Sequence, residues 1–281
     1  MTNQVILGVD LGGTQIRAGL VADQKPGIIK SQVIRSKATQ EQVLEEIFSF
    51  IDGCITPETH AIGIGVPGLV QPEKGIVSEV VNIPAWTTVP LQSILEDRYR
   101  LPIAINNDSN CFALGEFYFG KGKGHDSMLG ITIGTGLGTG IIIDHKLYSG
   151  KHGGAGELGM SDYLDKYYEY YASGQFFQNI YNEDGIEVYN KAQQGDAAAI
   201  RKYEEMGLHL GNALKNILYA YDISLVVLGG SVSQAFPFFH EAMWKSLKDF
   251  AYKQTLADLR IEVSQLENSG ILGAAALQFS C

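Results

Sequence analysis

Two glycine-rich turns, each set between two apolar runs, constrain the fold of this 281-residue chain more than any other feature. The first turn is LGGT (11–14) and the second is TGLG (135–138). The flanking runs are VILGVD (5–10), QIRAGLVA (15–22), MLGITIG (128–134) and TGIIID (139–144). A short glycine-containing connection between two strand-like runs predicts a β-hairpin. Because helix and strand patterns follow both hairpins, the sequence predicts two α/β lobes of similar plan.

The rest of the chain supplies the remaining elements of these lobes. We expect further strands at 27–36, 61–66, 102–108, 224–230 and 260–266, and helices at 39–52, 90–99, 109–120, 196–221, 237–253 and 269–279. Ligands of open α/β sheets bind outside the carboxyl ends of the strands. Four such ends are expected to converge: Asp10, Asp108, Gly134 and Gly229. We therefore predict a cleft between a smaller lobe, 1–107 plus 268–281, and a larger lobe, 108–267.

Charge and apolar pattern argue against several classes of partner. The net charge of −10 disfavours nucleic acid, which needs clustered Lys and Arg. No apolar run approaches the ~20 residues that span a bilayer, and the N-terminus lacks the features of a signal peptide. Cys54, Cys111 and Cys281 are far apart, so neither a disulfide framework nor a cysteine zinc site is expected. We expect a cytoplasmic protein without a nucleic-acid or membrane partner.

The glycine-rich turns can present backbone N–H groups to phosphate oxygens. The first turn would supply donors from Gly12, Gly13 and Thr14. Asp10, at the preceding strand end, can hold Mg²⁺ through water. GTGLGTG (134–140) repeats the arrangement, and GGSVS (229–233) can pass close to a nucleotide's base and ribose. The alternative is that all three are ordinary turns that need glycine for their conformation.

Asp108 ends an apolar strand just where a helix begins. It can therefore be a helix N-cap, a common role of aspartate. It can equally accept the proton of a substrate hydroxyl that attacks a γ-phosphate, because phosphoryl transfer needs little beyond alignment, a carboxylate base, Mg²⁺ and donors for the phosphate. Asn107 beside it can bind a second hydroxyl.

Two glutamates stand in unusual surroundings. Glu157 lies in a glycine-rich loop and Glu169 among tyrosines. A carboxylate in such a place must be paired, exposed or bound to a donor-rich ligand. Sugars carry many hydroxyl donors, and aromatic faces suit their C–H surfaces. The alternatives are a solvated loop for Glu157 and a core or subunit interface for the tyrosines.

Taken in order, these segments resemble the ROK family of sugar kinases, which are similar to actin and hexokinase in fold. The resemblance covers nearly the whole chain. Its motifs are DLGGTQIRAGLV (10–21), GIGVPGLVQPEKGIV (63–77), NIPAW (82–86), NNDSNCFALGE (106–116), IGTGLGTGIIIDHKLYSGKHGGAGELG (133–159), GGSVS (229–233) and ILGAAAL (271–277). The resemblance implies an α/β, two-lobed, ribonuclease H-like ATPase fold with a central cleft.

Carried over by position, the resemblance implies a role for each candidate residue. Asp108 would be the general base. The sugar contacts would be Gly68, Asn82, Asn107, Glu157 and Glu169. The phosphate contacts would be Gly12, Gly13, Thr14, Thr135 and Gly136, with Mg²⁺ held by Asp10 through water. Gly229 and Gly230 would lie near adenosine, and ATP would be the phosphoryl donor.

The chain departs from the family pattern after Glu157. The family has a histidine where this chain has Met160, and three cysteines follow it that this chain lacks. In the family that histidine contacts the sugar and a structural zinc ion, so no structural zinc is expected here. Our hypothesis is that packing by Tyr163, Tyr167 and Tyr168 supports Glu169 instead of zinc. The loss of the histidine also leaves the identity of the sugar open.

The resemblance implies an ATP-dependent hexose kinase that acts on the 6-hydroxyl of glucose or a related sugar, as a homodimer. N-acetylmannosamine, N-acetylglucosamine and fructose remain alternative substrates. Three rivals belong to other classes: a sugar-responsive transcription regulator, an inactive sugar sensor, and an actin-like filament ATPase. The first is disfavoured because the first expected strand begins at about residue 5 and leaves no room for a helix-turn-helix. The sugar-side motifs disfavour the filament.

Overall fold

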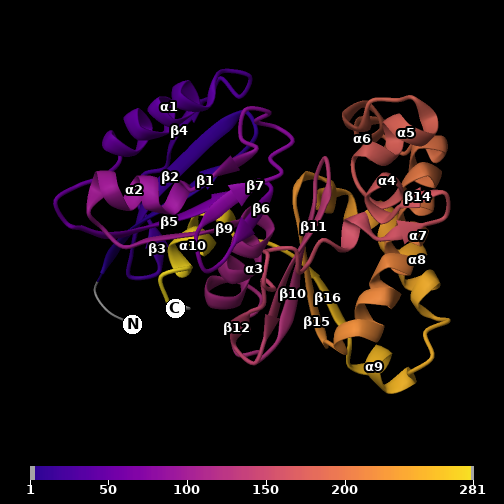
Figure 1. The fold of residues 1–281 in the computed structure, drawn as a ribbon. Helices are drawn as coiled ribbons and strands as arrows, with labels where there is room; N and C mark the ends of the chain where they lie inside the picture. Colours follow the sequence, from indigo (N-terminus) through magenta and orange to yellow (C-terminus); the bar gives the residue numbers. More distant parts are fainter. Residues whose placement is uncertain (1–3, 280–281) are drawn as a thin grey trace. The chain divides into compact units, whose positions relative to one another are not determined.

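The structure, a computed structural model, describes residues 4–279. It divides into two compact α/β units (Figure 1). The first comprises the chain up to Asp126, Gly140–Ala155 and the chain from Gln265 onward, and the second comprises Ser127–Thr139 and Gly156–Ser264. The predicted α/β class with two lobes is confirmed. In the described chain no helix is long and apolar enough to cross a membrane.

The boundary between the units differs from the one expected at residues 107 and 108. Residues 108–126 and 140–155 are grouped with the first unit. The reason is packing, because helix α3, Asp108–Phe119, lies against helix α10, Ser269–Ala276, from the other end of the chain. The prediction already joined 268–281 to the N-terminal part of the chain, but it assigned 108–126 and 140–155 to the other lobe.

A six-stranded sheet forms the centre of the first unit. Its strands are β1 (Val5–Leu11), β2 (Gln15–Ala22), β3 (Lys25–Pro26), β4 (Lys30–Val33), β5 (Thr59–Val66) and β9 (Ile103–Asn107). The order is β3-β2-β1-β5-β9, with β4 also paired to β2. Strands β1 and β2 are antiparallel, which confirms the first predicted hairpin, and β1, β5 and β9 are parallel. The strand expected at 27–36 is shorter in the structure, where only β4 lies in that range, and β3 lies just before it.

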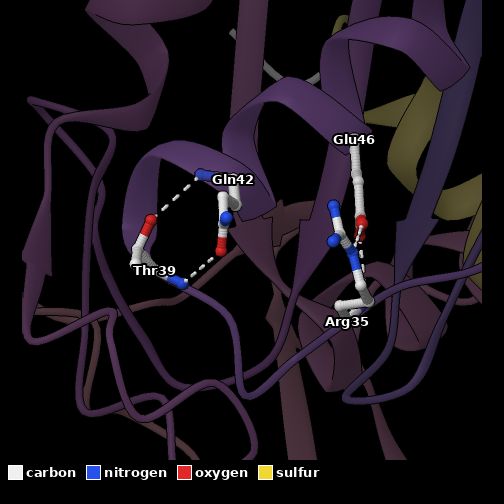
Figure 2. Close-up of polar contacts among 4 residues, drawn as sticks. All are labelled: Arg35, Thr39, Gln42 and Glu46. Atoms are coloured by element: carbon white, nitrogen blue, oxygen red, sulfur yellow. Dashed lines mark hydrogen bonds and ion pairs between the residues drawn. The ribbon is translucent and has the colours of Figure 1, made fainter.

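Two helices of the first unit follow the predicted boundaries. Helix α1, Gln40–Asp52, has the expected capping box: Gln42 N donates to Thr39 Oγ1 at 3.4 Å and Thr39 N donates to Gln42 Oε1 at 3.2 Å (Figure 2). Figure 2 also shows the ion pair between Arg35 and Glu46 that ties the preceding segment to this helix. Helix α2 spans Leu91–Tyr99. The three-stranded sheet β6 (Leu69–Gln71), β7 (Ile76–Ser78) and β8 (Thr88–Val89) lies between them in sequence and was not predicted.

Helix α10 packs against the sheet and against α3 through glycines. It lies among elements from the N-terminal part of the chain (Figure 1). A Cβ on Gly63 of β5 would lie 1.8 Å from the carbonyl oxygen of Ala274. A Cβ on Gly273 would lie 1.6 Å from the carbonyl oxygen of Cys111 in α3. These backbone approaches leave no room for a side chain, which explains glycine at position 63 of β5 and at position 273 of α10.

The sheet of the second unit is built on the second predicted hairpin. Strands β10 (Met128–Ile133) and β11 (Leu137–Ile143) are hydrogen-bonded neighbours in the order β12-β11-β10-β15-β16. The other members are β12 (Lys146–Leu147), β15 (Leu225–Gly229) and β16 (Arg260–Val263). Because β10, β15 and β16 are parallel, the ends of β10 and β15 that carry Gly134 and Gly229 point the same way.

The helical part of the second unit contains elements that the sequence pattern did not predict. It comprises α4 (Tyr168–Ala172), α5 (Gln175–Tyr181), α6 (Gly185–Gln193), α7 (Ala197–Tyr221), α8 (Phe236–Leu247) and α9 (Lys253–Asp258). Three short elements complete it: 3₁₀ turns η1 (Leu158–Met160) and η2 (Ser231–Ala235), and the hairpin β13 (Asp162–Tyr163) with β14 (Lys166–Tyr167). Helix α7 matches the prediction, whereas α4, α5 and α6 were missed.

The long helix expected at 237–253 is wrong, because α8 ends at Leu247. Phe250 is buried and its ring lies 4.3 Å from the ring of Tyr219 in α7. The next amide, Ala251 N, donates to the Tyr219 hydroxyl at 3.2 Å. This aromatic anchor takes the chain out of the helical path before α9 begins.

Candidate active site

In the first unit, the carboxyl ends of three parallel strands bring predicted site residues together. The register places Asp10 of β1 opposite Gly65 of β5, and Gly65 opposite Asn106 of β9. Asp10 also lies at the first turn of α10, where a Cβ on Gly270 would lie 3.2 Å from the carboxylate carbon. Burial raises the pKa of Asp10, and Arg17 partly offsets this increase. A bound cation would compensate the buried charge further.

Asp10 fits the proposed magnesium role. Mg²⁺ in phosphate-transfer sites usually keeps several waters and binds through one or two carboxylates plus substrate phosphates. One partly buried carboxylate beside a glycine turn meets that requirement. A metal ion held only by protein side chains would need a larger set of ligands. Within residues 4–279 no three His, Cys, Asp or Glu side chains lie together as such a set.

The first glycine turn contacts the predicted sugar-side loop. Gly12 N donates to Gln15 O at 2.8 Å, which closes the turn between β1 and β2. A Cβ on Gly13 would lie 2.4 Å from the Cβ of Asn82. Glycine at this position therefore has a packing reason as well as the proposed phosphate role. The structure brings Gly13, a predicted phosphate contact, against Asn82, a predicted sugar contact.

The capping role considered for Asp108 belongs to Asn107. The Asn107 side-chain oxygen accepts from Ser109 N at 2.8 Å and its amide nitrogen donates to Gly68 O at 3.0 Å. Gly68 adopts a φ of +86°, where L-residues are strained. Asp108 is the first residue of α3, and its side chain is exposed and accepts from Ser109 N at 2.8 Å. The cap thus anchors the backbone that presents Asp108.

A buried amide network beneath Asp108 was missed by the sequence reasoning. The Asn106 side-chain oxygen accepts from Asn107 N and from Asn110 Nδ2, both at 2.8 Å. Asn106 Nδ2 in turn donates to Ser149 Oγ at 3.2 Å. The repeated asparagines of NNDSN were the available signal, whereas the Ser149 contact joins positions 43 residues apart. The network fixes the end of β9 against the start of α3.

In the second unit, Glu169 contacts the second glycine turn. Leu137 N donates to Glu169 Oε2 at 2.9 Å, and Gln175 Nε2 donates to Glu169 Oε1 at 3.2 Å. A Cβ on Gly136 would lie 2.5 Å from Glu169 Oε2. A predicted sugar contact and a predicted phosphate turn are therefore joined by a hydrogen bond.

Glu157, the other predicted sugar-binding carboxylate, interacts electrostatically with Glu169. Glu157 precedes η1 and is exposed, and Met160 at the end of η1 has an exposed fraction of 55%. Although the residue as a whole is exposed, the protein around its carboxylate partly desolvates it and raises the pKa of Glu157, and the negative charge of Glu169 raises this pKa further. Ionised Glu157 is therefore unfavourable to the folded protein in the absence of a donor-rich ligand.

This raised pKa predicts that Glu157→Gln stabilises the ligand-free protein. A carboxyl whose folded-state pKa is raised loses its stability contribution as the pH rises through that pKa. We expect the variant to melt roughly 1–3 °C above wild type at pH 8, with the difference vanishing towards pH 4. Calorimetry across this pH range measures it, with Glu204→Gln on the exposed face of α7 as the control. A lower melting temperature for Glu157→Gln at pH 8 would contradict the prediction.

An open pocket of about 440 Å³ lies in the second unit beside the second glycine turn. Its wall includes Thr135 and the η2 residues Ser231, Val232 and Gln234. Gly230, with a φ of +82°, passes so close to β10 that a Cβ would lie 2.4 Å from Ile133 O. The pair Gly229–Gly230 thus turns the chain into the pocket, whereas the residues after it line the wall.

The other side of this pocket was missed by the sequence reasoning. Ile186 and Tyr189 of α6 line it, together with Phe177 of α5. Asp184 caps α6 by accepting from Ile186 N at 2.8 Å and from Glu187 N at 3.1 Å, and so fixes the first turn at the rim. An apolar wall of this kind facing a glycine turn suits a flat aromatic ligand that carries phosphate.

The comparisons with known proteins show the family to which the chain belongs. The chain belongs to the ROK family, whose family model matches residues 6–280. A glucokinase from Streptomyces coelicolor is 33% identical over 309 residues, with 96% of each chain covered. An N-acetyl-D-glucosamine kinase from Pasteurella multocida is 29% identical over 303 residues, with 97% of this chain and 99% of the relative covered.

A solved structure shares the whole fold. It is a ROK family glucokinase from Streptomyces griseus in complex with glucose and AMPPNP, 29% identical, with a TM-score of 0.83. The likeness covers 97% of this chain and 98% of that one. The family match and this likeness confirm the predicted family and its actin-like, hexokinase-like fold.

Proposed function

We propose that this protein, an ATP-dependent sugar kinase of the ROK family, transfers the γ-phosphoryl group of ATP to a hexose hydroxyl with Asp108 as the general base. The observation that carries the proposal is the start of α3, where Asn107 caps the helix and Asp108 is left as an exposed carboxylate at its first residue. A base must be accessible to its substrate and held in place. The proposal is further supported by the glucokinase relatives of the chain.

The sugar is proposed to bind through its hydroxyls to Asn107, Glu157 and Glu169, and to contact Gly68 and Asn82 as well. Each carboxylate oxygen accepts hydroxyl hydrogens, and Glu157 gains most because donors from a ligand would compensate its unfavourable charge. Glucose is the proposed first substrate. The Pasteurella multocida relative supports N-acetylglucosamine as the second candidate, and N-acetylmannosamine and fructose remain to be compared.

The phosphates are proposed to bind the two glycine turns, through Gly12, Gly13, Thr14, Thr135 and Gly136. Adenosine would occupy the pocket that follows Gly229 and Gly230, between η2 and α6. Mg²⁺ held near Asp10 through water would neutralise charge on the phosphates when bound.

The proposed step needs only one proton transfer to the protein. The 6-hydroxyl oxygen of the sugar forms a bond to the γ-phosphorus while the bond from that phosphorus to the bridging oxygen of ADP breaks. The hydroxyl proton passes to the Asp108 carboxylate. The glycine-turn N–H groups supply donors to the transferred phosphoryl group without reorganisation.

An alternative from another class of protein is a catalytically inactive sugar sensor. The presence of Met160 in place of the family histidine favours this alternative. Both readings predict sugar binding, but only the kinase predicts sugar-dependent ADP release. We also propose a homodimer in the cytoplasm by analogy with the family, to be checked by sedimentation analysis and cell fractionation.

Coupled ADP release with Mg²⁺-ATP tests the proposed function. Glucose, mannose, fructose, glucosamine, N-acetylglucosamine and N-acetylmannosamine are compared with a reaction that lacks sugar. The kinase proposal predicts that at least one sugar raises ADP release well above the sugar-free rate. No stimulation by any sugar, with melting temperatures still raised by sugar or ATP, would favour the sensor.

The α6 wall gives a prediction for the nucleotide alone. Ile186 has an exposed fraction of 72% and lines the pocket, so Ile186→Glu is compatible with folding. A carboxylate there repels the phosphates and removes apolar contact, and we expect the KM for ATP to rise roughly tenfold with the sugar KM unchanged. Ile28→Glu, at an exposed position of the first unit, is the control. Equal KM values for ATP in both variants would show that adenosine does not bind in this pocket.

A further inference from the structure

Helix α4, which carries Glu169 in its first turn, is too short to hold its own position. It comprises five residues, Tyr168–Ala172, and its N-terminus has no side-chain cap. Isolated helices of this length are unstable in water, so their orientation is set by tertiary contacts. The contacts that α4 makes with α5 and α7 therefore decide where the Glu169 carboxylate lies.

A row of polar side chains on α7 holds the tyrosines that precede Glu169. Asn216 Nδ2 donates to the Tyr168 hydroxyl. Asn212 Nδ2 donates to the Tyr163 hydroxyl at 2.9 Å, and His209 Nδ1 lies 3.1 Å from the same hydroxyl. The spacing of three, four and seven residues puts these side chains on one face of the helix.

The two tyrosines form one unit on this face. The rings of Tyr163 and Tyr168 are stacked with centroids 4.2 Å apart and an interplanar angle of 18°. Tyr168 N also donates to Ser161 O at 3.1 Å, which ties α4 to the segment that follows Glu157. Tyr168 is thus joined to α7 by its hydroxyl, to Tyr163 by its ring, and to the Glu157 segment by its backbone.

On the side of its ring that faces β11 and η1, Tyr168 is not tightly packed. It lines a small cavity of about 20 Å³ together with Leu137 and Thr139 of β11 and Leu158 of η1. The buried Thr139 hydroxyl has no hydrogen-bond partner among the residues that the structure describes. Atoms beside a void lose dispersion contacts, so directional hydrogen bonds contribute more to the position of the ring.

We propose that Tyr168 and Asn216 are positioning residues for Glu169, and through it for the second glycine turn. The path runs from Asn216 to the Tyr168 hydroxyl, along the backbone to Glu169, and from its carboxylate to Leu137 N. The sugar-binding role of Glu169 in this path rests on the proposed function, whereas the contacts themselves do not. Neither residue touches the reacting atoms in this account.

Two single substitutions and their combination test the path. Tyr168→Phe removes only the hydroxyl and keeps the stacked ring, and Asn216→Ala removes the donor from an exposed helix position. We expect each to raise the sugar KM roughly fivefold with kcat changed less than about twofold, and the double variant to match the singles. Tyr170→Phe is the matched control on the same helix: its hydroxyl lies 3.5 Å from Asn179 O, too far for a strong hydrogen bond, so its loss should leave the sugar KM unchanged.

Hydrogen exchange at Leu137 gives a readout that does not depend on activity. Because Leu137 N donates to Glu169, we expect its exchange to accelerate roughly tenfold in both single variants, with Ile131 of β10 unchanged. Unchanged exchange at Leu137, or equal acceleration at both amides, would overturn the positioning role. Faster exchange at Leu137 with no sugar turnover in wild type would support the positioning role and count against the proposed function.

Discussion

Asp108→Asn is expected to lower kcat by about 10²–10⁴-fold, because asparagine cannot accept the hydroxyl proton. The substitution keeps the size and the accepting oxygen of the side chain, so the hydrogen bond from Ser109 N can persist. The cap of α3 is unaffected since Asn107 provides it. Sugar and ATP should therefore still raise the melting temperature of the variant. The measurement is steady-state ADP release alongside calorimetric binding of sugar.

A matched control separates loss of the base from loss of a surface charge. Asp97→Asn changes an exposed carboxylate on α2 in the same unit and should retain full turnover. If Asp108→Asn kept more than about a tenth of wild-type kcat, Asp108 would not be the general base, because a general base usually contributes more than that to the rate. If Asp108→Asn lost sugar binding as well, its main role would be in binding.

Gly273→Ala is expected to abolish stable folding of the first unit. The added Cβ would lie 1.6 Å from the carbonyl oxygen of Cys111, where two helix backbones meet and no flexible side chain can move aside. Forced separation of α10 and α3 should cost at least about 3 kcal/mol, at the upper end of overpacking effects. Urea unfolding, or the yield of folded protein where none remains, measures the effect. Gly154→Ala is the control, because a Cβ there meets no atom within 4 Å.

The contact between α3 and α10 at Gly273 also supports two of the proposed site residues. Helix α10 places Gly270 beside Asp10, and α3 begins with Asp108. A separation of the two helices therefore displaces the proposed magnesium ligand and the proposed base together. A stable Gly273→Ala variant with normal turnover would show that the α3–α10 contact is not required for either residue.

The elements with local signals could be predicted from the sequence. The two hairpins follow from glycines between apolar runs, and β1 and β9 end within one residue of the expected ends, Asp10 and Asp108. The capping box of α1 follows from the spacing of Thr39 and Gln42. In each case the residues that decide the structure lie within a few positions of one another.

The contacts that tune the site join distant residues and have no local signal. The cap by Asn107, rather than Asp108, depends on which of two adjacent side chains turns back on the helix. The bond from Leu137 N to Glu169 spans 32 positions, and the Asn216–Tyr168 bond spans 48. The pocket proposed for adenosine depends on α6, a helix of nine residues that periodicity did not distinguish from a loop.

³¹P NMR of a mixture of the protein, Mg²⁺-ATP and glucose can test whether the protein transfers a phosphoryl group to a sugar hydroxyl. We expect a new sugar-phosphate resonance coupled to the C6 protons, which grows as the γ-phosphate signal of ATP declines. The same spectra with N-acetylglucosamine would compare the second candidate substrate. Release of inorganic phosphate alone, or unchanged ATP with either sugar although both ligands bind, would contradict phosphoryl transfer to the sugar.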